Sequence, residues 1–517
     1  MTPPPISRRG VLAGAAGLGA AGVLGARAQA AGTPKMNVII FLTDQQRATQ
    51  DFPAGWEAAN LPGLTRLKNS GLSFENAFTN ACMCSPARAT LMSGYFPAQH
   101  GVKYTLEESL TGAQYPQVTL PLPAKLTNIA TVMTAAGYNC VYKGKFHLVK
   151  PAGSTYVPSD VGQYGFTRWN PQDAGANTAI SEAGGGTTNN DGRFMSDAGA
   201  VSAGDEGVLA YLNTVAASEQ PFCLIVSLVN PHDVLFYPKS YTSAGYDASW
   251  LTGTIQPPST VNESLASKPA VQAEFLNLTN AGLGKIKGLA AQQDYLNFYG
   301  NLLKLADGYL VDMLNALDSL NLTDSTLIIR TSDHGEMGLS HGGQRQKNFN
   351  FYEQSMMVPL VYSNPQLFPK PVTSSALVSH VDFLPTLATL FDAPASARSA
   401  WQGVDYSSIV MNPAAPAVQS YIVFTYDDYQ SGQMPPYPSP PNHIVSVREA
   451  RYKLAEYYDT TGTVASQWEM YDLKADPNEI HNLAAPGYVR NATQQAAYDQ
   501  LLALLTKVKK TRLKPLA

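Results

Sequence analysis

A cysteine placed for nucleophilic chemistry is the most informative residue of this 517-residue sequence. Cys84 begins the run Cys-Ser-Pro-Ala-Arg-Ala-Thr-Leu-Met-Ser-Gly, with a proline two residues on and Arg88 four residues on. The pattern predicts a helix that starts at Cys84, where free N–H groups and the helix dipole attract negative charge. A thiol kept at that position would have a lowered pKa and could attack an electrophile. The ordinary alternative is a small buried hydrophobe.

Other polar side chains stand just after apolar runs that predict buried strands. Taken singly, each is better explained as a cap, a turn residue or a solvated charge. In an open α/β sheet, however, ligands collect at the carboxyl ends of the strands, so these side chains are expected to converge. They are Asp44 and Gln45, Lys145 and His147, His232, Asp333 and His334, and Lys347, which precedes a further strand.

The motifs also follow a recognisable order along the chain. The order begins with Asp44 and Gln45 and continues with the motifs C-x-P-x-R, G-K-x-H, P-H and S-D-H-G, followed by a lysine before Tyr-Glu. The segment W-E-M-Y-D-L-K-A-D-P-N-E-I-H-N-L-A comes near the end of the chain. This order resembles the type I sulfatases of the alkaline-phosphatase superfamily over nearly the whole chain. Within this group the chain resembles arylsulfatases, and the pair of Gln45 and His334 also resembles choline sulfatases and phosphonate monoester hydrolases. The resemblance implies an exported sulfuric ester hydrolase.

The resemblance further implies that Cys84 is oxidised to formylglycine by a formylglycine-generating enzyme, and that the hydrate of this aldehyde is the nucleophile. One divalent cation would be held by Asp44, Gln45, Asp333 and His334, with the modified Cys84 as a further ligand. Oxygen ligands favour Ca²⁺. Many family members have Asp where this chain has Gln45 and Asn where it has His334, which makes Mn²⁺, Mg²⁺ or Zn²⁺ alternatives.

The same resemblance assigns roles to the remaining polar residues. Sulfate esters repel nucleophiles, so the site must place positive charge at the sulfate oxygens. By this analogy Lys145 and Lys347 bind the sulfate oxygens, with Arg345 as the alternative to Lys347, and Arg88 contacts and orients the modified residue. Asp333 would accept a proton from the attacking hydroxyl. His147 would deprotonate the second hydroxyl, and His232 would protonate the leaving oxygen.

Three alternatives remain beside cleavage of a small-molecule or carbohydrate sulfate ester. A phosphonate or phosphate ester could be hydrolysed in the same site, since both reactions need a cationic pocket. A non-catalytic relative could bind anionic sugars without cleaving them, with Cys84 unmodified. Cys84 could also act as a thiol beside Arg88. The run Thr-Tyr-Asp-Asp-Tyr at 425–429 could line a pocket for a ring or a cation, or simply end a surface strand.

The elements expected to carry these residues form an α/β sandwich with a large mixed, mostly parallel sheet, plus a small C-terminal antiparallel sheet with a terminal helix. We expect a catalytic domain over 36–395 and a subdomain over 396–517. Long loops over 153–192 and 241–285 are candidate specificity elements. Predicted strands cover 36–43, 139–143, 221–229, 325–331, 357–362, 421–425, 443–447, 452–457 and 467–471; predicted helices cover 61–71, 122–137, 207–218, 294–320, 381–390 and 496–513.

The N-terminal segment 1–31 has the features of a twin-arginine signal peptide. Arg8 and Arg9 precede an Ala/Gly/Leu run that ends in an A-x-A-like site, which predicts a periplasmic or secreted protein. The formal net charge of −4 gives no reason to expect a nucleic-acid partner, and no later apolar run predicts stable membrane insertion. Cys140 and Cys223 are expected to be buried free thiols.

Overall fold

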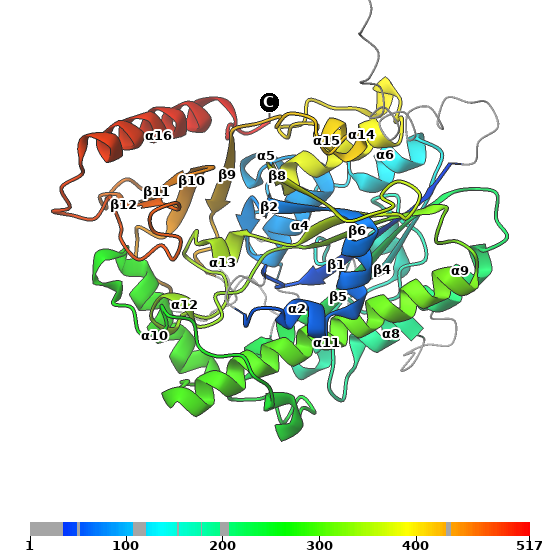
Figure 1. The fold of residues 1–517 in the computed structure, drawn as a ribbon, viewed down its shortest axis with the longest axis horizontal. Coiled ribbons are helices and arrows are strands. Elements are labelled where there is room, and N and C mark those ends of the chain that lie inside the picture. Colours follow the sequence, from blue (N-terminus) through cyan, green and yellow to red (C-terminus); the bar gives the residue numbers. More distant parts are fainter. Residues whose placement is uncertain are drawn as a thin grey trace, which may run out of the picture.

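The computed structural model describes residues 35–48, 52–106, 120–151, 153, 155–176, 178–196, 206–430 and 436–516. These residues form a seven-stranded sheet A, a five-stranded sheet B and helices that cover both (Figure 1). The predicted fold class, an α/β sandwich with a small antiparallel sheet and a C-terminal helix, is confirmed. The predicted signal peptide lies outside the described residues. None of the described helices is both long and apolar enough to cross a bilayer.

Sheet A has the strand order β4-β5-β1-β6-β7-β2-β8. The first four strands are parallel, and β7 runs antiparallel to its two neighbours. Parallel strands end at one edge of the sheet, so the residues that follow β1, β4, β5 and β6 gather there. The strands are β1 Asn37–Asp44, β2 Gly71–Phe78, β4 Asn139–Gly144, β5 Phe222–Pro231, β6 Thr326–Ser332, β7 Leu360–Ser363 and β8 Val372–Ser379.

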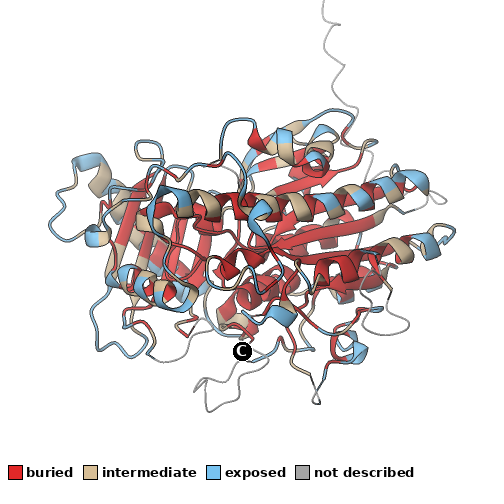
Figure 2. Cartoon of the chain, turned by 90° about the horizontal axis from the view of Figure 1, so that it is seen from below, coloured by how far each residue is buried: buried red, intermediate tan, exposed pale blue. Residues whose placement is uncertain are grey.

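Apolar layers cover both faces of sheet A. Val38, Ile40 and Leu42 of β1 join a layer with α4, α6, α14 and α15, whereas Ile39 and Phe41 point the opposite way, toward α3, α9 and α11. Burial on both faces explains why the central strands are continuous apolar runs, and Figure 2 shows the buried strands behind the long α11. These helices are α3 Pro62–Asn69, α4 Cys84–Ser93, α6 Ile129–Ala135, α9 Val208–Val215, α11 Gly288–Ser319, α14 Phe383–Leu390 and α15 Ser407–Met411.

Sheet B contains the four predicted C-terminal strands and one strand from far upstream. Its order is β12-β11-β10-β9-β3, and β3 (Ala81–Cys82) pairs parallel with β9 just before α4 begins. The C-terminal sheet is therefore joined directly to the segment that carries Cys84. The helix α16 (Ala492–Thr511) packs on this sheet (Figure 1). The other strands are β9 Tyr421–Tyr426, β10 His443–Glu449, β11 Tyr452–Tyr458 and β12 Gln467–Asp472.

Several predicted boundaries were wrong. The strands β2 and β8 were not predicted, because their polar residues interrupt any clear alternation of apolar and polar side chains. The helix predicted over 122–137 is limited to α6, because the Asn128 side chain caps its start by accepting hydrogen bonds from the backbone N–H groups of Ala130 and Thr131. The region 241–285 is not a loop throughout, since it contains α10. The remaining helices are α2 Trp56–Asn60, α5 Pro97–His100, α7 Pro158–Gly162, α8 Asn190–Ser196, α10 Ala270–Leu283, α12 Ser340–Gly343 and α13 Glu353–Met356.

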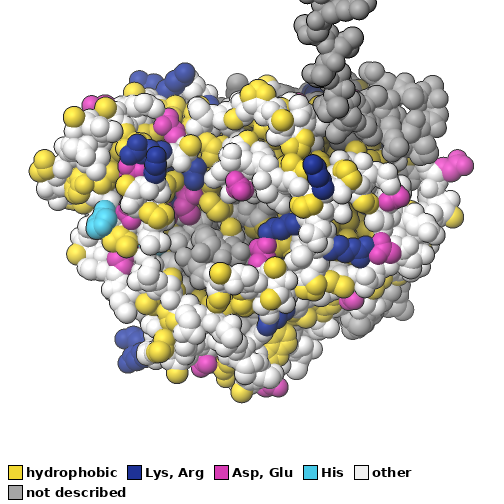
Figure 3. Space-filling view, viewed as in Figure 1, with side chains coloured by type: hydrophobic (Ala, Val, Ile, Leu, Met, Phe, Trp, Pro, Cys, Tyr) yellow, Lys and Arg dark blue, Asp and Glu magenta, His cyan; other side chains and the backbone are white. Residues whose placement is uncertain are grey.

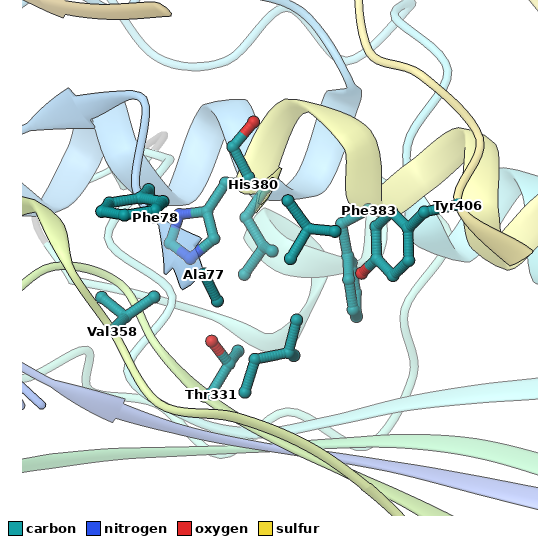
Figure 4. Close-up of a pocket in the computed structure, with 11 residues that line it drawn as sticks. Ala77, Phe78, Thr331, Val358, His380, Phe383 and Tyr406 are labelled. Atoms are coloured by element: carbon teal, nitrogen blue, oxygen red, sulfur yellow. The ribbon is translucent and has the colours of Figure 1, made fainter. Parts of the chain in front are cut away.

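A small pocket lies in the apolar layer between sheet A and α14 (Figure 4). Phe78, Val358, Phe383 and Tyr406 form much of its lining, together with the ring of His380. Burial lowers the pKa of His380 to about 3, so its ring is neutral. The pocket is apolar apart from a few polar atoms, and we assign it to core packing.

Candidate active site

Four buried side chains meet at the carboxyl edge of sheet A. Asp44 ends β1, Asp333 and His334 follow β6, and Cys84 begins α4 as predicted. Their oxygen, sulfur and nitrogen atoms lie within 4.8 Å of one another, close enough to bind one metal ion. Each residue is at most 1% exposed. The space-filling view shows a hollow near the centre of this face of the molecule, with charged side chains of both signs around it (Figure 3).

The Arg88 guanidinium links the two carboxylates from within α4. Its Nη2 donates to Asp44 Oδ2 at 3.1 Å and its Nε donates to Asp333 Oδ2 at 2.9 Å. The Oδ1 atoms point the other way, since Asp44 Oδ1 lies 3.5 Å from the Cys84 sulfur and Asp333 Oδ1 lies 3.7 Å from His334 Nε2. Arg88 thus orders the carboxylates around the cysteine, and its Nη1 donates to the Lys145 carbonyl and to Ser227 Oγ.

The Cys84 thiol is enclosed by acceptors. Its sulfur lies 3.1 Å from His334 Nε2, while His334 Nδ1 faces the Gly335 carbonyl at 3.0 Å and must donate to it. The lone pair of Nε2 is therefore turned toward the sulfur and the carboxylates. Burial and the nearby Asp44 raise the pKa of Cys84 to about 12. This direction is opposite to the lowering that a helix N-terminus by itself would give.

Lys145 and His147 extend from the end of β4. Gly144 has a φ of +106° and approaches Ser227 so closely that a Cβ would lie 1.9 Å from the Ser227 carbonyl oxygen, so only glycine fits. Lys145 Nζ lies 2.5 Å from Asp44 Oδ2 and also donates to a backbone carbonyl. Asp173 accepts the backbone N–H of His147 at 2.7 Å and fixes this turn.

The His147 ring has a defined tautomer. Its Nε2 lies 2.8 Å from the Leu106 carbonyl and donates to it. Its Nδ1 is buried, with no hydrogen-bond partner within the described part of the chain. Burial and Lys145 hold the pKa of His147 well below its usual value, so Nδ1 carries a free lone pair. This arrangement suits a proton acceptor.

The loop between β6 and β7 brings Lys347 beside Gln45. Lys347 Nζ donates to Gln45 Oε1 at 2.7 Å. Arg345, the alternative, instead donates to the Tyr237 and Gly284 carbonyls at 3.3 and 2.7 Å. Of the two basic side chains, Lys347 is the one placed at the sheet edge.

His232 follows β5 and completes the group of predicted residues. It is 4% exposed, and burial together with the positive charge of Lys145 keeps its pKa well below the ordinary value. Interactions with Asp44, Lys347 and His334 also contribute, which places the ring within the same charged cluster.

The charges of this site create a place for a divalent cation. Burial opposes ionisation of Asp44, but Lys145, His232 and Arg88 hold its pKa well below the usual value. Burial and the charge of Asp44 raise the pKa of Asp333 to about 7. A cation between the carboxylates would remove this repulsion, and carboxylate oxygens with an imidazole nitrogen are ordinary ligands for one. The residues present therefore fit a bound divalent metal.

Three residues that support the site were not predicted from the sequence. Ser227 Oγ accepts from Arg88 Nη1 at 2.8 Å, although it sits in a strand that is otherwise apolar. Asp173 fixes the turn that carries His147, and Glu336 accepts from the Gln45 side chain. A serine inside a buried strand was a weak signal, whereas Asp173 had none. His341, which shares a loop with Lys347, bonds to Glu263 and stacks on Tyr352 instead of entering the site.

Comparison with known proteins gives a consistent result. The model of the Sulfatase family matches residues 36–393, and the model described as N-sulphoglucosamine sulphohydrolase, C-terminal, matches residues 342–510. An ulvan-active sulfatase of Formosa agariphila is 25% identical and the match covers 87% of this chain and 77% of that protein. A choline-sulfatase of Rhizobium meliloti is also 25% identical, with 91% and 87% covered.

Solved structures share the fold. A 2-O GAG sulfatase superposes with a TM-score of 0.68 at 21% identity, and the match covers 92% of each chain. The phosphonate monoester hydrolase of Agrobacterium radiobacter superposes with a TM-score of 0.63 at 21% identity, covering 92% of this chain and 96% of that one.

Proposed function

The chain belongs to the sulfatase family, and we propose that it hydrolyses a sulfate monoester through formylglycine made from Cys84. The observation that carries the proposal is the convergence of Cys84 with Asp44, Asp333 and His334 inside a shell of buried cations. A sulfuric ester hydrolase needs a nucleophile at the point where positive charge is concentrated, because its substrate is an anion.

Modification of Cys84 answers a chemical difficulty of the unmodified site. A thiol with a pKa of about 12 is almost entirely protonated at neutral pH and makes a poor nucleophile. A formylglycine-generating enzyme would replace the thiol by an aldehyde, using its own oxidant. The hydrated aldehyde presents two hydroxyl groups, and Asp44 Oδ1 and His334 Nε2 already face that position.

The cation would be held by Asp44, Gln45, Asp333 and His334, with the modified Cys84. Bound there, it would lower the pKa of a coordinated hydroxyl and neutralise negative charge on the sulfate. The mixture of carboxylate, amide and imidazole ligands favours Ca²⁺, with Mn²⁺, Mg²⁺ or Zn²⁺ as alternatives. Arg88 holds the carboxylates with their free oxygens directed inward.

The other polar residues supply charge and move protons. Lys145 and Lys347 would bind sulfate oxygens, and Asp333 would accept the proton of the attacking hydroxyl. His147 Nδ1 would accept a proton from the second hydroxyl, so that the aldehyde re-forms and sulfate leaves. The negative charge of a bound ester would raise the pKa of His232, which then could protonate the departing alcohol oxygen.

We propose a small-molecule or carbohydrate sulfate ester as substrate. The support is that proteins similar to this one are named for ulvan, N-acetylglucosamine-6-O-sulfate and choline sulfate. A phosphonate or phosphate ester is the second candidate, favoured by the fold shared with a phosphonate monoester hydrolase. Export through the segment 1–31, maturation before export, and a division near residue 395 into catalytic domain and subdomain complete the proposal.

One set of measurements tests the proposal. The chain is produced with a formylglycine-generating enzyme, and the peptide containing Cys84 is weighed by mass spectrometry. Turnover of the sulfate, phosphate and phosphonate esters of 4-nitrophenol is then compared. We expect the mass of formylglycine, sulfate turnover above the other two, and loss of turnover in Cys84→Ser but not in Cys140→Ser. Only thiol in active enzyme would overturn the mechanism, and dominant phosphonate turnover would overturn the substrate.

A further inference from the structure

Glu336 is a buried carboxylate directly behind the predicted metal site, and no role in the proposed chemistry has been given to it. It follows the Asp333-His334-Gly335 motif and is fully buried. Its Oε2 accepts from Gln45 Nε2 at 2.5 Å, and its Oε1 accepts from the Tyr295 hydroxyl at 2.6 Å. The backbone N–H of Gln346 lies 3.0 and 3.1 Å from the two oxygens. Several donors thus point at this one side chain.

These contacts determine which way the Gln45 amide faces. An ionised carboxylate only accepts hydrogen bonds, so the atom of Gln45 that faces Glu336 must be the NH₂ group. A lysine ammonium only donates, so the atom that faces Lys347 Nζ at 2.7 Å must be the amide oxygen. The two constraints come from opposite sides of the amide and agree. Gln45 Oε1 is therefore the atom presented to the sheet edge.

Glu336 also supplies charge and holds the neighbouring loop. Gln45 is neutral, and the carboxylate that accepts a hydrogen bond from its side-chain amide is Glu336. Through the backbone of Gln346, the same carboxylate fixes the residue before Lys347. Glu336 therefore binds both the Gln45 side chain and the loop that carries Lys347, which meet in the Gln45–Lys347 hydrogen bond.

We propose that Glu336 is a positioning residue of the metal site: it turns the Gln45 amide oxygen toward the cation and places a negative charge behind this neutral ligand. The inference rests on the proposed function, because it concerns the cation that the mechanism requires. The partner of a ligand commonly changes metal affinity when it is mutated, even though it never touches the metal.

The test measures Ca²⁺ binding by calorimetry on metal-stripped protein, with a repeat using Mn²⁺. In Glu336→Gln the new amide can donate as well as accept, so Gln45 is free to turn its NH₂ group toward the cation. We expect a loss of about 10- to 100-fold in affinity. The exchange variant Gln45→Glu/Glu336→Gln restores an oxygen ligand and its charge, and we expect it to recover most of that loss. Glu353→Gln, which removes another buried carboxylate away from the site, is the matched control and is expected to keep the wild-type affinity.

The outcomes separate this role from the proposed function. No cation binding by the wild-type chain would overturn the metal site itself and this role with it. Wild-type binding that Glu336→Gln changes by less than about 2-fold would overturn the positioning role alone, while the metal site stood. Circular dichroism records whether each variant is folded. If Glu336→Gln does not fold, the exchange variant decides, because folded protein with weak binding would overturn the role.

Discussion

Arg88 Nε donates to Asp333 Oδ2 at 2.9 Å, from a helix that begins at the residue proposed as nucleophile. Both side chains are completely buried. The same guanidinium also bonds to Asp44 and Ser227, so one side chain connects α4 to the end of β1, to the middle of β5 and to the residue that follows β6. The position of Cys84 relative to the carboxylates therefore depends on Arg88, four residues away on the same helix.

Replacing Arg88 by lysine is expected to remove activity and much of the stability. A lysine keeps the charge but cannot bond to two carboxylates in the forked geometry of a guanidinium. Loss of the hydrogen bond to one of the two buried carboxylates costs about 1.5–3 kcal/mol of unfolding free energy. Urea unfolding and ester hydrolysis measure the two effects. The control is Arg451→Lys, at a solvent-exposed arginine whose ion pair with Asp472 is expected to contribute little to stability. Equal effects of the two substitutions would contradict this account.

His147→Asn is expected to slow the second half of the reaction and spare the first. The Nδ1 lone pair is needed only when the sulfated enzyme breaks down, so alcohol should still be released once per active site. General base catalysis contributes about 10²- to 10⁴-fold, and the steady-state rate should fall by a factor in that range. Stopped-flow release of 4-nitrophenol from its sulfate shows the effect as a burst of one equivalent followed by slow turnover. A proportional loss of the burst would mean that His147 acts earlier.

His232→Asn is expected to harm poor leaving groups more than good ones. 4-Nitrophenolate leaves without a proton, whereas an alkyl alcohol needs one from a general acid. The rate for a sugar or alkyl sulfate should therefore fall about 10²-fold or more, with a clearly smaller loss for 4-nitrophenyl sulfate. Plotting log kcat/KM against the pKa of the leaving alcohol gives a steeper slope for the variant. An unchanged slope would assign His232 to binding instead of proton transfer.

The sequence was sufficient for residues that stand next to long apolar strands. Asp44, Lys145, His232 and Asp333 each follow such a strand, and parallel strands end at one edge, so their convergence could be predicted. Arg345 and Lys347 could not be ranked in this way, because the loop between β6 and β7 has no period to orient it. Only its contacts in the folded chain show which of the two reaches Gln45.

The residues that support the site could not be predicted either, because their partners lie far away in the sequence. Glu336 and Gln45 are 291 positions apart, and nothing in either local sequence indicates the other. Asp173 likewise lies in a stretch without helical or strand periodicity, although it anchors the turn at His147. The strands β2 and β8 were missed because their polar residues hide the alternation. Packing between distant segments decides all of these cases.

Acidification is expected to lower the stability of the folded chain through His100, whose ring contacts α4. This ring is 1% exposed, and its Nδ1 accepts from the Val102 N–H at 3.1 Å. Its Nε2 lies 3.1 Å from Thr90 Oγ1, and this hydroxyl in turn donates to the Pro86 carbonyl. Both ring nitrogens are thus used by the neutral tautomer. Burial and Lys103 lower the pKa of His100 to about 3, against an ordinary value of 6.5.

The sign of this pH effect follows from the lowered pKa. The unfolded chain binds a proton at His100 as pH falls below 6.5, whereas the folded chain does not until about pH 3, so stability present above pH 6.5 is lost on acidification. Between pH 7 and pH 4.5 the loss from this residue is about 2–3 kcal/mol. Urea unfolding at both pH values measures the effect. The loss of stability between pH 7 and pH 4.5 should be smaller in His100→Gln than in the wild-type chain by about this amount, whereas His481→Gln, at an exposed histidine, should behave as wild type. The same pH dependence in His100→Gln and wild type would show that other groups cause the acid sensitivity.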